Sequence, residues 1–189
     1  MNRRTSLIVA AGALALGFLP PRPLAARELA GVYMPDAVVA GEKTLNLNGL
    51  GLRKKSFFKV YVGGLYLENP SKDAAAILAA DVAKGVKMRF LRDLKKTQLT
   101  EAFTEGFEAN AKEKAAAQKA SIDKMLALVP DVKEGDVMTF VYVPGKGTTL
   151  SVGEKALGTF EGKDFADAVF SLWLGPKPPS EDLKKGMLG

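Results

Sequence analysis

The stretch that decides the fold runs from Leu45 to Glu68 and reads LNLNGLGLRKKSFFKVYVGGLYLE. From Val60 to Leu67 almost every side chain is apolar, aromatic or glycine, on both faces that a strand would present. A strand with one exposed face alternates apolar and polar residues, whereas a strand covered on both faces reads as a nearly continuous apolar run. We therefore expect a central strand here, entered through a turn near residues 54–56.

The first half of the same stretch changes phase at a glycine. Leu45 and Leu47 alternate with asparagines, but after Gly49 the apolar residues are Leu50 and Leu52. A shift of one residue beside a glycine is typical of a β-bulge or a tight bend. The sequence therefore predicts an irregular strand just before the turn.

The rest of the chain indicates strands at both ends and a helical block between them. Further strands are expected at residues 38–40, 86–91, 137–143, 148–152 and 156–160. Helices are expected at 73–80, from an N-cap at Thr97 to Pro130 with a bend near 115–120, at 165–174, and after Ser180. This order predicts an α+β fold with an antiparallel sheet.

The composition excludes several kinds of chemistry. The 189 residues include no cysteine and no histidine. Disulfides, thiol nucleophiles and histidine-based acid–base catalysis are therefore excluded, and most transition-metal sites would lack their usual ligands. We expect neither a metal nor a cofactor.

Residues 1–26 are expected to be a cleavable signal peptide, followed by a single domain at 27–189. Arg3 and Arg4 precede an uncharged apolar run at 7–19, and small residues at 24–26 suit cleavage before Arg27. We expect export to the periplasm, by the general secretory (Sec) route rather than the twin-arginine (Tat) route. The apolar run is too short to span a bilayer, so no stable membrane insertion is expected.

The charge of the remaining chain is small. Removing Arg3, Arg4 and Arg22 from the 27 basic residues leaves 24 against 21 acidic residues, a net charge of +3. A net charge this small gives little reason to propose binding to nucleic acid. We therefore do not expect nucleic acid as a partner.

Arg53 and Tyr61 are the candidate binding residues of the central stretch. A guanidinium binds a carboxylate through two parallel hydrogen bonds, and a tyrosine hydroxyl supplies one more donor. The pattern alone leaves a second interpretation open, in which Arg53 is exposed beside the turn and Tyr61 packs in the core.

Four motifs carry a resemblance that covers nearly the whole chain after residue 26. They are N-G-x-G-x-R at 48–53, F-K-V-Y-V-G-G-L-Y-L-E at 58–68, L-x-x-x-F-x-x-G-F at 99–107 and L-G-x-x-x-x-S-x-D-L-K at 174–184. In this order they resemble the chalcone isomerase superfamily, in particular its bacterial chalcone-isomerase-like branch. The resemblance implies an antiparallel sheet wrapped by helices, an open-faced β-sandwich, with a ligand cleft between sheet and helices.

The resemblance also bears on activity. Plant chalcone isomerases use an arginine and a threonine on the first sheet segment, a tyrosine and an asparagine on the long helix, and a polar residue on the penultimate helix. Arg53 matches the arginine, and Tyr61 stands at the threonine position, as in the fatty-acid-binding relatives. Leu99, Gly106 and Leu172 stand at the other three positions. Their lack of polar groups removes the means to polarise and orient a flavanone-type carbonyl.

The resemblance therefore predicts an exported, non-catalytic protein that binds a small apolar carboxylate such as a fatty acid. Arg53 and Tyr61 would hold the carboxylate. The tail site would be lined by Phe57, Phe103, Phe107 and Leu172. Two alternatives stay open: an intramolecular lyase or isomerase that acts on a chalcone-like or other enone substrate through Arg53, and a periplasmic protein-interaction module without a small ligand.

Overall fold

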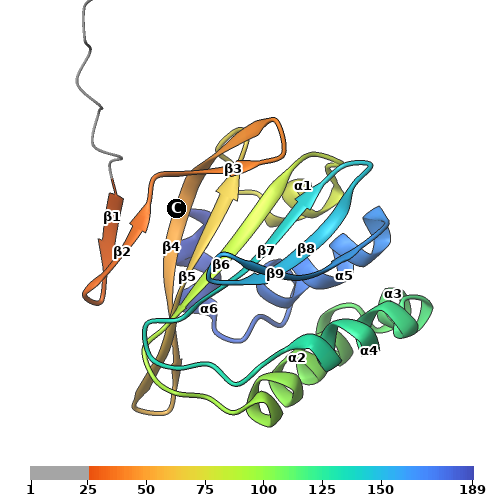
Figure 1. Cartoon of the computed structure of the whole chain (residues 1–189). Helices are drawn as coiled ribbons and strands as arrows, with labels where there is room; N and C mark the ends of the chain where they lie inside the picture. The colour runs from red at the N-terminus through yellow and green to blue at the C-terminus, as the bar shows by residue number, and fades with distance from the viewer. Residues whose placement is uncertain (1–25) are drawn as a thin grey trace, which may run out of the picture.

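A seven-stranded antiparallel sheet organises residues 26–189, the part of the chain that the computed structural model describes (Figure 1). The expected signal peptide at 1–26 lies outside the described residues, except for Ala26. The strands of the sheet follow one another in chain order: β3 (Ala37–Ala40), β4 (Lys43–Lys55), β5 (Phe58–Leu67), β6 (Lys84–Phe90), β7 (Val137–Val143), β8 (Gly147–Val152) and β9 (Lys155–Phe160). A separate hairpin precedes them, made of β1 (Ala26–Leu29) and β2 (Val32–Pro35).

The helices follow three of these strands. They are α1 (Ala74–Ala79) after β5, then α2 (Lys96–Asn110), α3 (Lys112–Ala117) and α4 (Lys119–Leu128) after β6, and finally α5 (Lys163–Leu174) and α6 (Glu181–Leu188) after β9. No helix among residues 26–189 is long and apolar enough to cross a membrane. The sheet curls as a half-barrel, with the helices packed along it (Figure 1). The predicted α+β class, with an antiparallel sheet wrapped by helices, is confirmed.

The predicted irregularity in β4 decides which face Arg53 occupies. The register of β4 against β5 shifts between Leu47 and Gly49, which confirms the expected bulge. Before the shift, Leu45 and Leu47 pack in the cluster that the β1–β2 hairpin covers. After it, odd-numbered residues turn towards the helices. Because side chains alternate along a strand, Arg53 would face the β1–β2 side without this one-residue slip.

The glycines of β4 also let a helix lie directly on the sheet. A Cβ atom at Gly51 would lie 2.1 Å from the carbonyl oxygen of Leu183, and one at Gly49 would lie 2.2 Å from that of Gly186. Both distances are far shorter than any real contact, so only glycine fits between β4 and α6. The sequence pattern had indicated a bend at these residues, and the structure adds a helix-packing reason for them.

The helical block differs from the single bent helix expected between Thr97 and Pro130. It consists of three helices, with one break at Gln118, inside the bend expected at 115–120, and another at Ala111, which was not expected. The first helix starts earlier than predicted, after an N-cap at Lys95 rather than at Thr97.

A long-range contact explains where α2 ends. The side-chain amide of Asn110 donates to the carbonyls of Gly106 and Lys177, over 3.0 and 2.8 Å, and its oxygen accepts from the backbone N–H of Lys177 over 2.7 Å. These bonds tie the last turn of α2 to the loop that follows α5. Local helical periodicity carries no information about such a partner.

Candidate functional site

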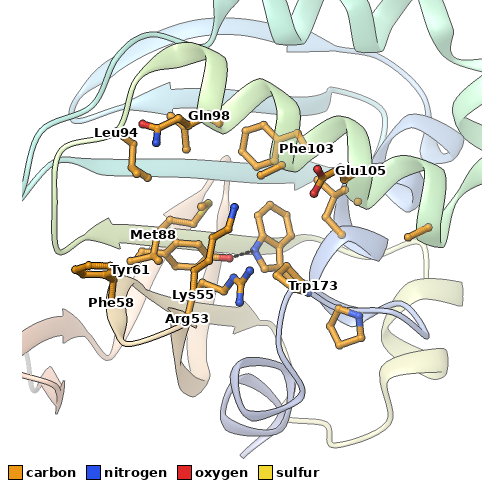
Figure 2. Close-up of a pocket in the computed structure, with 18 of the residues that line it drawn as sticks. Arg53, Lys55, Phe58, Tyr61, Met88, Leu94, Gln98, Phe103, Glu105 and Trp173 are labelled. Carbon is orange, nitrogen blue, oxygen red and sulfur yellow. Dashed lines mark hydrogen bonds between the residues drawn. The ribbon is translucent and has the colours of Figure 1, made fainter.

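A cavity of about 600 Å³ lies between the β4–β5 hairpin and the helices (Figure 2). This size falls in the range of small-molecule sites. Strands β4, β5 and β6 form one wall, α2 faces them, and the end of α5 with the following loop closes a third side. The lining includes Arg53, Lys55, Phe58, Val60, Tyr61, Met88, Arg92, Leu94, Gln98, Leu99, Phe103, Glu105, Gly106, Leu172, Trp173, Lys177 and Pro178.

The structure brings Arg53 and Tyr61 together at this cavity. They are cross-strand partners in the β4–β5 hairpin, and such partners carry their Cβ atoms about 5 Å apart on the same face of the sheet. Arg53 is half-buried and Tyr61 is buried. The guanidinium of Arg53 donates to the carbonyl of its neighbour Lys54, which leaves further N–H groups of the fork for a ligand.

Tyr61 is held by Trp173, the single tryptophan of the chain. The indole Nε1–H of Trp173 donates to the Tyr61 hydroxyl oxygen over 3.1 Å (Figure 2). The Tyr61 ring also meets Phe90 edge to face, with centroids 6.0 Å apart. Because the oxygen accepts from the indole, the hydroxyl proton is available to an acceptor in the cavity.

The hydroxyl of Tyr61 stays neutral over the physiological range. Burial raises its pKa to about 12, although the hydrogen bond from Trp173 and the positive charge of Arg53 both act to lower it. Tyr61 is therefore a hydrogen-bond donor, and it does not add negative charge next to Arg53. The pair offers a cation and a neutral donor, which suits an anionic ligand group.

The lining of the cavity combines charged and apolar residues. Of the lining residues, Arg53, Lys55, Arg92 and Lys177 are basic and Glu105 is acidic. Figure 2 shows Arg53 and Lys55 extending beside the Tyr61–Trp173 pair, while Phe103 and Met88 lie among the apolar part of the lining. The hairpin side of the cavity is therefore positively charged, and the α2 wall is mostly apolar apart from Gln98 and Glu105.

Four of the six residues predicted for the ligand site line the cavity. Phe103 and Leu172 join Arg53 and Tyr61 there. Phe107 is buried in the core but is not among the lining residues, although Gly106 and Ala109 of the same stretch of α2 are.

The prediction for Phe57 is wrong. This residue sits at the tip of the β4–β5 hairpin with 98% of its surface exposed. It is not among the residues that line the cavity. The reason is the turn itself: Phe57 lies between the two strands, where side chains no longer alternate between the faces of the sheet.

The positions that resemble catalytic sites of plant chalcone isomerases also line the cavity. Leu99, Gly106 and Leu172 all contribute to it and supply no side-chain polar group. Gly106 lets α2 and α5 approach closely, because a Cβ atom there would lie 2.7 Å from Cδ2 of Leu172. The wall opposite Arg53 is therefore mostly apolar and tightly packed.

Sequence reasoning missed Trp173, Lys55 and Arg92. Trp173 follows the apolar stripe of α5, and that helix is buried on nearly all sides, so the stripe did not single it out. A usable signal existed nonetheless: a buried indole N–H requires an acceptor, and Tyr61 is one of only four tyrosines in the chain.

Comparisons with known proteins agree with this description. A fatty-acid binding protein of Arabidopsis thaliana has a similar structure, with a TM-score of 0.70 and 14% sequence identity over 87% of this chain and 96% of that one. At that identity the likeness establishes the fold alone. No curated protein matches the sequence. The model of the chalcone isomerase-like family matches residues 26–189, and the chain therefore belongs to that family.

Proposed function

We propose that this protein binds a small apolar carboxylate, such as a fatty acid, in the cavity and catalyses no reaction there. The observation that carries the proposal is the Arg53–Tyr61–Trp173 arrangement. A forked cation and a neutral, buried hydroxyl stand side by side at the edge of a cavity whose opposite wall is mostly apolar. A carboxylate would accept from Arg53 and Tyr61, and its hydrocarbon chain would contact Phe103, Leu99 and Leu172.

The name of the Arabidopsis neighbour is consistent with this ligand class. The proposal itself depends on the donors and the apolar wall of this chain. The interaction-module alternative would be favoured by a filled core, and a cavity of about 600 Å³ is present instead.

Displacement of a fluorescent fatty-acid analogue by palmitate tests the proposal. Hydrogen bonds to charged groups contribute about 1.5–3 kcal/mol each, so Arg53→Gln should raise the dissociation constant about 10- to 150-fold. Arg89→Gln is the matched control. Arg89 lies on β6 but is not among the lining residues, and we expect its variant to bind like the wild type.

Native mass spectrometry of protein isolated from its own host identifies the ligand. We expect a bound acid that is lost in Arg53→Gln and retained in Arg89→Gln. A cavity that carries no acid, together with no binding of fatty acids in titration, would falsify the proposal.

The enzyme alternative makes an opposite prediction. An intramolecular lyase acting through Arg53 would accelerate ring closure of chalcones, and Arg53→Ala would abolish the acceleration. We expect no rate above the uncatalysed one, because Leu99, Gly106 and Leu172 supply no proton donor or acceptor. Turnover that collapses in Arg53→Ala would overturn the non-catalytic assignment.

We propose further that the protein is exported and loses residues 1–26. The support is the sequence pattern alone: paired arginines, an uncharged apolar run at 7–19 and small residues before Arg27. The intact mass of the protein recovered from the periplasm of its host should correspond to a chain that starts at Arg27. Recovery of the full-length chain in the cytoplasm would contradict this.

A further inference from the structure

We propose that the tip of the β4–β5 hairpin docks on a bilayer that contains anionic lipid, with Phe57 and Phe58 entering the interface and the surrounding lysines contacting lipid phosphates. This inference concerns the hairpin tip, part of which also lines the cavity, and it does not require that a ligand be bound. Its starting point is the position of Phe57, which the proposed binding site does not use.

The tip exposes two adjacent aromatic rings. Phe57 is 98% exposed and Phe58 is 61% exposed. The other large exposed apolar residues of the described chain, such as Tyr33, Val39 and Val82, are not adjacent to one another in sequence. Single exposed apolar residues are ordinary, whereas a contiguous pair at a projecting tip indicates an interaction site.

The tip also projects beyond its neighbours. The last backbone bond from β5 to its neighbour runs from the N–H of Leu91 to the carbonyl of Val60, so residues 54–59 extend past the rest of the sheet, towards the lower end of the view in Figure 1. A narrow hairpin of this kind can enter a bilayer interface without burying the body of the protein.

The charges around the two rings have one sign. Residues 53–60 read RKKSFFKV and contain four basic residues and no acidic one. Arg92 adds a further cation, with its guanidinium 4.7 Å from the centroid of the Phe58 ring. Within residues 26–189, none of these five cations has a carboxylate oxygen within ion-pair distance.

Two of the lysines are placed against each other. Lys54 and Lys59 are direct cross-strand partners, and like charges in that position destabilise a hairpin. An external anionic surface would remove this repulsion. Basic residues near an anionic bilayer strengthen binding, and amphipathic aromatic side chains enter its interface. The combination favours a bilayer over an acidic protein, which would leave the two rings in contact with water.

The tip adjoins the mouth of the cavity. Lys55, Ser56 and Phe58 belong both to the tip and to the cavity lining. If the cavity binds a fatty acid, docking would place its opening against the bilayer, so that the acid could pass between them without crossing water.

Vesicle flotation tests the docking. The protein used is residues 26–189, which contains every strand and helix described and the entire family match. The uncharged apolar run at 7–19 then contributes nothing to partitioning. Vesicles of phosphatidylcholine with phosphatidylglycerol are compared with vesicles of phosphatidylcholine alone, at low and at high salt. We expect binding to the anionic vesicles only, weakened by salt.

Two pairs of lysine variants distinguish the contribution of the tip to vesicle binding from that of the net charge of the protein. Each basic residue near an anionic surface changes partitioning about fivefold, so Lys54→Gln with Lys59→Gln should weaken binding roughly 25-fold. The matched control is Lys72→Gln with Lys146→Gln. These exposed lysines lie at the opposite end of the sheet and carry the same charge. We expect the control to retain nearly all binding.

A second pair of variants tests the contribution of the exposed aromatic rings to vesicle binding. Phe57→Ser should weaken partitioning about tenfold, since it removes an aromatic ring from the interface, while Val39→Ser on the edge strand β3 should not. In Phe57→Trp, brominated acyl chains should quench the new fluorescence but not that of buried Trp173 in the wild type.

Three outcomes would overturn the inference: no flotation of the wild type with anionic vesicles, equal loss in the two lysine pairs, or sedimentation as a dimer that Phe57→Ser dissociates. The last result would assign the tip to contacts between copies of the chain. Loss of palmitate binding with retained flotation would instead refute the proposed ligand and leave the docking surface standing.

Discussion

Replacing Tyr61 by phenylalanine separates a ligand-binding tyrosine from a structural one. The change removes one oxygen, which accepts from Trp173 over 3.1 Å and, at a residue that lines the cavity, can donate its own proton to a ligand. The ring, its burial and its edge-to-face contact with Phe90 stay as they are. Any effect therefore comes from two hydrogen bonds, one to the indole and one to the ligand.

The two bonds have different readouts. Loss of the acceptor leaves the indole N–H of Trp173 unpaired, which costs about 1–3 kcal/mol when the group is buried. The adjoining cavity can admit water to that site, so we expect about 1 kcal/mol of lost unfolding free energy. Loss of the donor removes a hydrogen bond to a carboxylate, which should raise the dissociation constant for palmitate about 10- to 150-fold.

Urea denaturation measures the first effect, and displacement of a fluorescent fatty-acid analogue measures the second. Methyl palmitate is the control ligand, because it keeps the chain and lacks the charge. We expect Tyr61→Phe to lose affinity for the acid far more than for the ester. Unchanged affinity for palmitate, with the expected loss of stability, would show that Tyr61 is a structural residue and refute the reasoning.

Three further predictions concern Tyr61, Lys84 and Gly51. Because burial raises the pKa of Tyr61 to about 12, its hydroxyl should remain protonated near pH 10, where a tyrosine of ordinary pKa is half ionised; an absorbance titration of the wild type against Tyr61→Phe that shows ionisation of Tyr61 near pH 10 would contradict a neutral donor. Lys84 is buried and donates to the carbonyls of Ile77 and Ala80, over 2.6 and 2.7 Å, and burial, followed by the charge of Lys163, lowers its pKa to about 8. Between about pH 8 and pH 10.5 the unfolded chain then binds more protons than the folded one, so the unfolding free energy of the wild type relative to Lys84→Met should rise with pH in urea titrations; a difference that falls across this window would contradict the assignment. Gly51→Ala should lower the unfolding free energy by about 3 kcal/mol or more, since its Cβ would overlap the carbonyl of Leu183. Gly85→Ala, where the nearest atom is 3.5 Å away, is its matched control and should cost much less, and equal losses in the two would show that α6 does not lie on β4 as described.

Most of the strands were predictable because their signals are local. The apolar run in β5 and the phase slip beside Gly49 both concern residues a few positions apart, and the structure places a strand and a bulge there. The break of the helical block at Ala111 was not predictable in the same way. It depends on Asn110 bonding to Lys177, a residue 67 positions away, and no helical periodicity reports such a contact.

The same difference between local signals and long-range contacts applies to the residues of the candidate site. Arg53 and Tyr61 were singled out because an arginine and a tyrosine stand out in an apolar stretch, and the resemblance to chalcone isomerases supported their role as ligand-site candidates. Phe57 was misplaced because alternation fails in a turn, where its side chain is exposed. Trp173 was missed because α5 is buried almost all round, so its sequence does not tell which face meets the cavity.

The motif at residues 48–53 makes physical sense once these contacts are known. Asn48 is the extra residue of the bulge, since Leu47 and Gly49 pair with consecutive residues of β5. Its side chain holds that position: the amide donates to the carbonyls of Ser71 and Met187, over 2.9 and 3.0 Å, and the oxygen accepts from the N–H of Ser71 over 2.8 Å. A bulge with such anchors is fixed in register and does not slide along β4.

Each remaining letter of the motif depends on that register. Gly49 and Gly51 must face α6, because no Cβ fits beneath its carbonyls. Arg53 comes two residues after Gly51 and so faces the same side, opposite Tyr61 and against the cavity. Were the bulge lost, the glycines and Arg53 would all turn to the β1–β2 side together. The bulge therefore determines both how α6 packs on the sheet and which face Arg53 occupies. A requirement of folding and the geometry of the proposed binding site depend on the same register.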